Sequence, residues 1–134
     1  HGGLLGAPAV HTRSSRARTL DYVHAPRERD RNIGKSREWS ALPTRSWAGQ
    51  RVVVVDDIFD EGVTLAAVED YCLAQGASSV LSAVLVDKRH RRKCSSRGPD
   101  VVGLSLPDHY LFGMGMDYKG YLRNSRAIYA LTDY

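Results

Sequence analysis

The chain has 134 residues, 43% of them hydrophobic and 25% charged, a balance typical of a folded globular domain rather than a disordered or fibrous one. A chain of this length supports one hydrophobic core, so we expect a single domain over residues 1–134. No apolar run reaches the roughly 18 residues that suggest a membrane span, and we therefore expect a soluble cytoplasmic protein. The net charge of +4 gathers in two basic stretches, 11–38 and 88–97, which would suit solvent, a polyanionic ligand or nucleic acid equally well.

The N-terminal third contains few regular patterns. The chain begins with His-Gly-Gly rather than Met, so we expect that a strand leading into this turn precedes it and that the sequence is N-terminally incomplete. Residues 20–24 alternate in a way that suits a strand. Residues 25–42 are polar and charged and contain Pro26 and Gly34, and we expect a long flexible loop there. Loops longer than about 12 to 15 residues are uncommon in compact domains, so this one is either an active-site lid or disordered.

A strand, a helix and a second strand follow in close succession. Four consecutive valines, residues 52–55, predict a central strand buried on both faces of a parallel sheet. Thr64 is placed to cap a helix whose apolar residues from Leu65 to Cys72 recur on one face, and Gly76 is placed to end it. Residues 80–86 predict the second strand, which completes one βαβ unit.

The last third offers two more short strands, over residues 101–104 and 127–131. Cys72 and Cys94 occur in unlike contexts, one in a helical pattern and one in a basic stretch. We therefore expect two free thiols rather than a metal pair or a disulfide.

The residues after the valines carry the chemistry. Ligands of parallel sheets bind beyond the carboxyl ends of the strands, and Asp56 and Asp57 stand there. Two adjacent carboxylates are costly to bury unless they meet a metal, hydroxyl groups or backbone donors, and a ribose diol would satisfy both. Gly62 permits a tight turn, and the following helix start with the Thr64 hydroxyl suits a phosphate, so the two features together describe a ribose 5-phosphate. For the aspartates taken alone, a solvated loop or a simple Mg²⁺ site is the alternative.

The string of four valines followed by DDIFDEGVTL resembles the phosphoribosyl diphosphate signature of the type I phosphoribosyltransferases. The segment VDKR from Val86, and PDHYLFGMGMDYKGYLRN from Pro107 to Asn124, resemble the purine-binding half of the hypoxanthine and guanine phosphoribosyltransferases, especially bacterial ones. The resemblance covers most of the chain from Gly2 onward. It implies an α/β fold of the type I phosphoribosyltransferase kind, a mainly parallel twisted sheet flanked by helices, with a long flexible loop and a C-terminal hood.

The resemblance also implies residue roles for catalysis and metal binding. Asp56 and Asp57 would hold the ribose hydroxyls and, with Asp117 acting through water, a Mg²⁺ ion. Asp60 would be the general base or acid at the purine N7, and Arg123 would bind the leaving diphosphate. A plainer interpretation of Arg123 is an ion pair with Asp117, six residues earlier.

Further implied residues bind the two substrates. Those implied to bind phosphoribosyl diphosphate, beside the two aspartates, are Gly2, Gly3, Glu61, Gly62, Val63 and Thr64. For the purine, Lys88 would donate to the 6-oxo group, Tyr110 would stack on the base, Leu111 would offer backbone contacts and Asp117 would lie nearby. Taken singly, Tyr110 also fits a half-buried aromatic and Lys88 a member of a solvated basic run.

The implied activity is Mg²⁺-dependent transfer of a phosphoribosyl group from phosphoribosyl diphosphate to hypoxanthine or guanine, in purine salvage, by a homodimer or homotetramer without nucleic-acid or membrane partners. Two features depart from the family pattern. Glu61 stands where many relatives have a threonine in the phosphate loop, and the long flexible loop 25–42 contains Arg27-Glu28-Arg29. The alternatives are a regulator that senses phosphoribosyl diphosphate and binds nucleic acid, and an inactive subunit that assembles with an intact relative.

Overall fold

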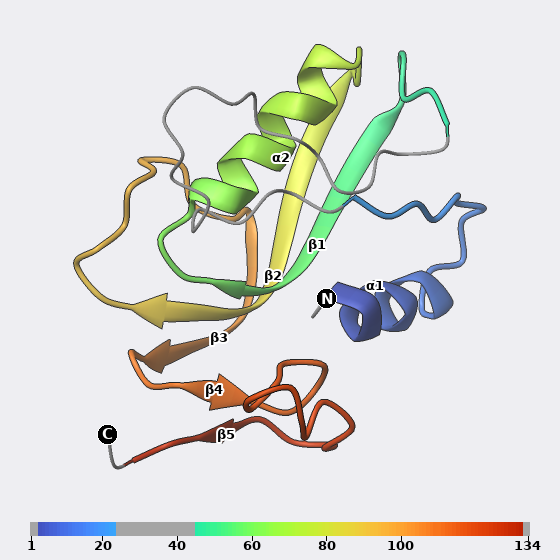
Figure 1. The fold of residues 1–134 in the computed structure, drawn as a ribbon. Helices are drawn as coiled ribbons and strands as arrows, with labels where there is room; N and C mark the ends of the chain where they lie inside the picture. Colours follow the sequence, from blue (N-terminus) through green and yellow to red (C-terminus); the bar gives the residue numbers. More distant parts are fainter. Residues whose placement is uncertain (1–2, 24–44, 133–134) are drawn as a thin grey trace.

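A three-stranded parallel sheet with a helix packed on one face forms the centre of the molecule (Figure 1). The computed structural model describes residues 3–23 and 45–132. The elements, in chain order, are α1 (Gly3–Thr12), β1 (Arg51–Phe59), α2 (Val63–Ala74), β2 (Ser79–Arg89), β3 (Val101–Pro107), β4 (Leu111–Phe112) and β5 (Tyr129–Ala130). The α/β class expected from the sequence is therefore confirmed.

The predicted βαβ unit is present, and its first strand is longer than expected. β1 and β2 pair in parallel from Arg51 opposite Ser79 to Phe59 opposite Asp87. Because this pairing continues past the valines, the two aspartates lie inside β1, and the strand end moves from Val55 to Phe59.

The prediction that the valine strand is central and buried on both faces is wrong for the described residues. The sheet order is β1-β2-β3, so β2 is the middle strand and β1 has one paired neighbour. Val53 is 43% exposed, whereas Ser82, Val84 and Val86 of β2 are buried in alternation. A run of β-branched residues indicates a strand, but which neighbours pair with it decides how deeply it is buried.

Helix α2 begins without the predicted threonine cap. Gly62 is the N-cap residue, in the left-handed conformation with φ 87°, and no side chain caps the helix. Thr64 is instead an exposed residue in the first turn. The C-terminal prediction holds, since the helix ends at Ala74 and Gly76 follows with φ 90°.

The remaining predicted elements have mixed outcomes. Among the described residues, 20–23 form no strand, and Leu20 and Tyr22 are 59% and 39% exposed. The strand predicted at 101–104 is confirmed and extends to Pro107, and the one predicted at 127–131 shrinks to Tyr129–Ala130. The predicted loop 25–42 lies outside the described residues.

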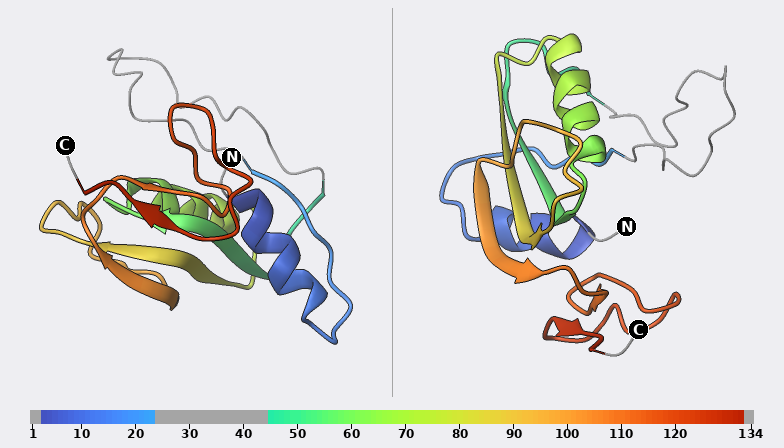
Figure 2. Two further views of the ribbon diagram at one scale, coloured as in Figure 1. Left: turned by 90° about the horizontal axis from the view of Figure 1, so that it is seen from below. Right: turned by 90° about the vertical axis from the view of Figure 1, so that its left-hand side faces the viewer.

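Residues 108–132 form a hood below the carboxyl ends of the sheet strands, as both views of Figure 2 show together with Figure 1. Within it, β4 and β5 pair antiparallel. Val86 of β2 is fully buried and packs with Leu111 and Met116 of the hood. This apolar cluster fixes the hood against the sheet.

Two other apolar clusters join α2 to the sheet. Phe59, Leu65 and Val84 form one, and Trp47, Cys72 and Ala77 form the other.

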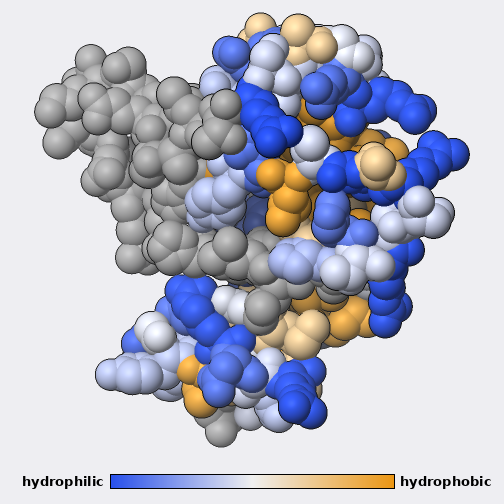
Figure 3. Space-filling model, turned by 90° about the vertical axis from the view of Figure 1, so that its right-hand side faces the viewer, coloured by the Kyte–Doolittle hydropathy of each residue, from blue (hydrophilic) through white to orange (hydrophobic). Residues whose placement is uncertain are grey.

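Both cysteines are free thiols, as predicted. Figure 3 faces the right-hand side of Figure 1 and shows apolar surface among hydrophilic residues on that side. No helix in the described part of the chain is long and apolar enough to span a membrane.

Candidate active site

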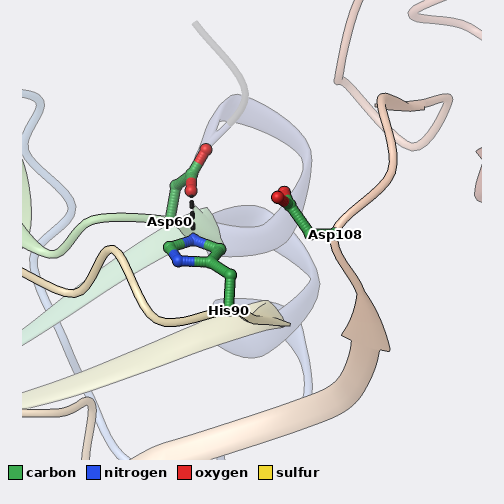
Figure 4. Close-up of side chains that lie close together, drawn as sticks. All are labelled: Asp60, His90 and Asp108. Atoms are coloured by element: carbon green, nitrogen blue, oxygen red, sulfur yellow. Dashed lines mark hydrogen bonds and ion pairs between the residues drawn. The ribbon is translucent and has the colours of Figure 1, made fainter. Parts of the chain in front are cut away.

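Three polar side chains meet where the three parallel strands end. Asp60, His90 and Asp108 are each the first residue after β1, β2 and β3, respectively. Figure 4 shows Asp60 and His90 joined by a hydrogen bond, with Asp108 opposite them. Parallel strands place their carboxyl ends at one edge, so three residues far apart in sequence become neighbours there.

Two cations hold this group together. Lys88, whose side chain is only 13% exposed, places Nζ 3.7 Å from Asp60 Oδ2 and 3.9 Å from Asp108 Oδ1. Arg92 donates from Nη1 to Asp108 Oδ2 at 2.7 Å. These bonds hold the pKa of the exposed Asp108 carboxyl below its usual range, with the Arg92 hydrogen bond as the main cause. We call Asp60, Lys88, His90, Arg92 and Asp108 the strand-end cluster.

Asp56 and Asp57 lie further back along β1, in partly buried positions. Asp56 Oδ1 accepts from the Asp57 N–H, and Asp57 Oδ1 accepts from the Ile58 N–H, each at 2.9 Å. Burial, and then the negative charge of Asp57, raise the pKa of Asp56 to about 7. Hydroxyl donors or a cation bound to this pair would offset the cost of burying two neighbouring negative charges.

The turn between β1 and α2 has the form expected of a phosphate loop. A Cβ atom at Gly62 would lie 2.9 Å from the Phe59 ring, so only glycine fits both the space and the positive φ. The first backbone N–H groups of α2 have no partner within the helix, and its dipole favours an anion at this end. The Glu61 carbonyl accepts from the Cys94 N–H at 2.8 Å, and the negative charge of the Glu61 side chain acts on Arg92.

Asp56 and Thr64 share one cavity. It has a volume of about 1110 Å³ and lies between β1, the start of α2, helix α1 and residues 16–23. Basic side chains at His11, Arg16 and Arg51 also line it. An anionic ligand there would meet the carboxylate and the helix start at once.

Of the predicted purine-side residues, Tyr110, Leu111 and Asp117 lie in the hood, whereas Lys88 lies in β2. Tyr110 donates its hydroxyl to the Asp117 carbonyl at 2.9 Å. Arg123 pairs with Asp117 Oδ1 at 2.9 Å and also donates to the Gly115 carbonyl at 2.8 Å, so the plainer interpretation of Arg123 is realised. Leu111 is buried at 5% exposure and packs against Val86, so its side chain belongs to the core and only its backbone is available to a ligand.

The predicted metal ligands Asp56 and Asp57 lie in β1, whereas the third, Asp117, lies in the hood. In residues 3–23 and 45–132, the group of three possible ligands within 4.8 Å of one another is Asp60, His90 and Asp108. In the described part of the chain, Asp117 therefore does not share a compact ligand group with Asp56 and Asp57. Of the predicted loop glycines, Gly3 is the first residue of α1 and Gly2 lies outside the described residues.

Sequence reasoning missed His90, Asp108 and Lys93. His90 lies in a basic stretch, and Asp108 lies within the segment that resembles the purine side; the available signal was that each is the fourth residue after a predicted strand, 80–86 or 101–104. Lys93 donates to Asp87 Oδ1 at 2.7 Å and to the Phe59 carbonyl at 3.0 Å, and its ammonium group lies 3.9 Å from the Phe59 ring centroid. It thereby ties the end of β1 to β2.

The basic stretch 88–97 is largely paired with carboxylates from other elements. Besides Lys88, Arg92 and Lys93, Arg97 pairs with Asp70 of α2 at 2.8 Å. Most of the positive charges in residues 88–97 therefore form ion pairs within the chain.

Comparisons with known proteins identify relatives of the chain. The family described as "Phosphoribosyl transferase domain" matches residues 2–119. The hypoxanthine-guanine phosphoribosyltransferase of Aquifex aeolicus is 38% identical over 85 residues, covering 63% of this chain and 47% of the relative. That of Bacillus subtilis is 33% identical over 76 residues, covering 57% and 42%. The chain thus spans about half the length of the curated relatives it matches.

Solved structures show the same fold. A hypoxanthine-guanine phosphoribosyltransferase from Bacillus anthracis superposes with a TM-score of 0.85 and 25% identity, over 97% of this chain and 75% of the other. A hypoxanthine-guanine-xanthine phosphoribosyltransferase superposes with a TM-score of 0.85 and 22% identity, over 99% and 76%. The second similarity is one of fold alone.

Proposed function

Since the chain belongs to the phosphoribosyl transferase domain family, we propose that it transfers the 5-phosphoribosyl group from phosphoribosyl diphosphate to hypoxanthine, guanine or both, releasing diphosphate. The relatives from Aquifex aeolicus and Bacillus subtilis are named for this reaction. The resemblance also implies a homodimer or homotetramer in the cytoplasm, and both remain predictions.

The observation that carries the proposal is that Asp56 and Thr64 line one cavity. A ribose diol would donate hydrogen bonds to Asp56 and its neighbour Asp57. The 5-phosphate would then meet the N–H groups at the start of α2, beside the Thr64 hydroxyl. One sugar phosphate satisfies both ends of the site, which neither a simple ion nor a base alone would do.

The residues at Asp56 and Asp57 fit Mg²⁺, because burial and mutual repulsion already raise the pKa of Asp56 and a cation would offset both. Mg²⁺ bound there would neutralise negative charge on the diphosphate as it leaves. Asp117 would act through water, since Arg123 and the Gly120 N–H already donate to its two carboxylate oxygens.

The protein's own groups manage the charge and the proton. The bond from the sugar C1 to diphosphate breaks as a purine nitrogen bonds to C1 from the opposite face. Asp60 accepts the proton that leaves N7 in the forward direction and returns it in reverse. Arg123, held by Asp117 and the Gly115 carbonyl, supplies positive charge for the departing oxygens.

Purine selection follows from donors at the strand ends and the hood. Lys88 has only donors to offer, so it favours a 6-oxo over a 6-amino group. Tyr110 is fixed by its bond to the Asp117 carbonyl and by an edge contact with Tyr118 at 5.8 Å, which presents its ring as a surface for the base.

The test is a turnover assay of this chain with phosphoribosyl diphosphate and Mg²⁺ and each of hypoxanthine, guanine, xanthine and adenine. We expect nucleotide and diphosphate in equal amounts from hypoxanthine, guanine or both, and none from adenine. No turnover of any 6-oxopurine, or preferred use of adenine, would contradict the proposal.

The regulator alternative gains no support from the basic stretch 88–97. Arg92, Lys93 and Arg97 are paired with carboxylates of the same chain, so they have less charge to give to nucleic-acid phosphates. Salt-sensitive binding of RNA or DNA without turnover would favour that alternative.

A further inference from the structure

We propose that His90 is a positioning residue that orients the Asp60 carboxylate for proton transfer, an inference that rests on the function proposed above. Asp60 needs such a residue because its side chain is 45% exposed at the start of a turn, where a carboxylate otherwise samples several rotamers. A general base must be held within hydrogen-bond reach of the proton it accepts.

His90 is a rigid partner for this purpose. Its side chain is only 5% exposed, and Nε2 lies 2.5 Å from Asp60 Oδ1. The ring directly follows β2, whose pairing with β1 continues to Phe59, the residue before Asp60, opposite Asp87, three residues before His90. A buried ring on one strand therefore fixes an exposed carboxylate on the next.

A second contact sets the proton on the ring. The Arg92 backbone N–H donates to His90 Nδ1 at 3.0 Å, so Nδ1 acts as an acceptor and carries no proton. In this tautomer Nε2 carries the hydrogen and donates it to Asp60 Oδ1. The direction of the His90–Asp60 bond is thus decided by the backbone.

The consequence is that the two oxygens of Asp60 have different tasks. Oδ1 accepts from His90, while Oδ2 lies 3.7 Å from the ammonium group of Lys88. N7 and the 6-oxo group are adjacent on the edge of a 6-oxopurine. Because Oδ2 lies near the Lys88 ammonium group, a bound 6-oxopurine would find a proton acceptor for N7 beside a donor for its 6-oxo group.

A metal ion at Asp60, His90 and Asp108 is the competing interpretation, because these ligand atoms are close together. Lys88 and Arg92 argue against it. Their two positive charges already balance the two carboxylates, and Lys88 lies within 4 Å of both. A divalent cation there would face an ammonium group at short range.

Kinetics of four proteins test the inference: wild type, His90→Ala, His90→Gln and, as a matched control from the same loop, Arg91→Ala. His90→Ala is expected to lower kcat by about ten- to a hundredfold while KM for phosphoribosyl diphosphate stays within about twofold. Glutamine carries an N–H donor near the position of Nε2 and should recover a large part of the rate, and Arg91→Ala should match wild type. Equal rates for His90→Ala and Arg91→Ala would overturn the proposal, as would equal losses in both His90 variants accompanied by a lower melting temperature.

A measurement without substrate separates this inference from the proposed function. Nitrogen-15 NMR of the His90 imidazole should show the Nε2–H tautomer, with a proton resonance that moves in Asp60→Ala and stays in Arg91→Ala. If wild type turns over no base, this spectrum still reports the His90–Asp60 bond, and only the function has failed. A ring that averages both tautomers would overturn the positioning role whatever the activity.

Discussion

At the scale of single residues, Asp60 is a carboxylate whose two oxygens have different neighbours. It directly follows β1, accepts a hydrogen bond from His90 on one oxygen and approaches Lys88 with the other. Asparagine at this position keeps the shape of the side chain but cannot accept a proton.

Asp60→Asn should therefore lower kcat by about 10²- to 10⁴-fold, with far smaller changes in KM for either substrate. Steady-state kinetics with hypoxanthine and guanine measure this. Asp70→Asn is the control, because Asp70 pairs with Arg97 on the exposed side of α2 and is remote in role. A variant at Asp60 with nearly intact turnover would show that another group handles the N7 proton.

At the scale of elements, the β1–α2 turn depends on Gly62 for two separate reasons. Its φ of 87° is a conformation that side chains disfavour, and a Cβ atom would lie 2.9 Å from the Phe59 ring. Phe59 is itself buried at 5% exposure and held by Lys93, so it has little room to move.

Gly62→Ala should lower the free energy of unfolding by about 3 kcal/mol, of which roughly 1 kcal/mol reflects the φ value and the rest the overpacked ring. Gly120→Ala separates the two terms, because Gly120 has a φ of 89° and a Cβ atom added there would meet nothing within 4 Å. Urea denaturation of both variants gives the comparison. Equal losses from the two substitutions would mean that the contact with Phe59 costs nothing.

At the scale of the whole molecule, the Asp56 and Asp57 pair links stability to pH. The pKa of Asp56 rises from 3.8 to about 7 on folding, mainly by burial and then by the charge of Asp57. Between these values the folded protein holds a proton that the unfolded chain has released, so raising the pH favours unfolding. The stabilisation is present below about pH 4 and is lost as the pH passes through about 7.

Asp56→Asn removes this titration. Relative to Asp56→Asn, the wild-type melting temperature should fall as the pH rises from about 4 to about 7 and then level off. Differential scanning calorimetry over that range measures the difference, and Mg²⁺ with phosphoribosyl diphosphate should reduce it at high pH. Parallel curves for the two proteins across the range would show that Asp56 is not buried as described.

The sequence by itself determined the parts of this protein that depend on local order. Four consecutive β-branched valines favour a strand, Gly62 favours a tight turn, and Leu65 and Cys72 mark the buried face of α2. The same segment contains the two aspartates and Asp60, so the sequence alone was enough to propose a sugar phosphate as the ligand.

Only the tertiary structure decided which residues meet. Asp60, His90 and Asp108 are neighbours because three parallel strands end at one edge, and no spacing in the sequence encodes that pairing. In residues 3–23 and 45–132, the edge position of β1, the exposed Thr64 and the absence of a strand at residues 20–23 have the same origin. Propensity acts between residues close in sequence, whereas burial and pairing are settled by the elements that pack against them.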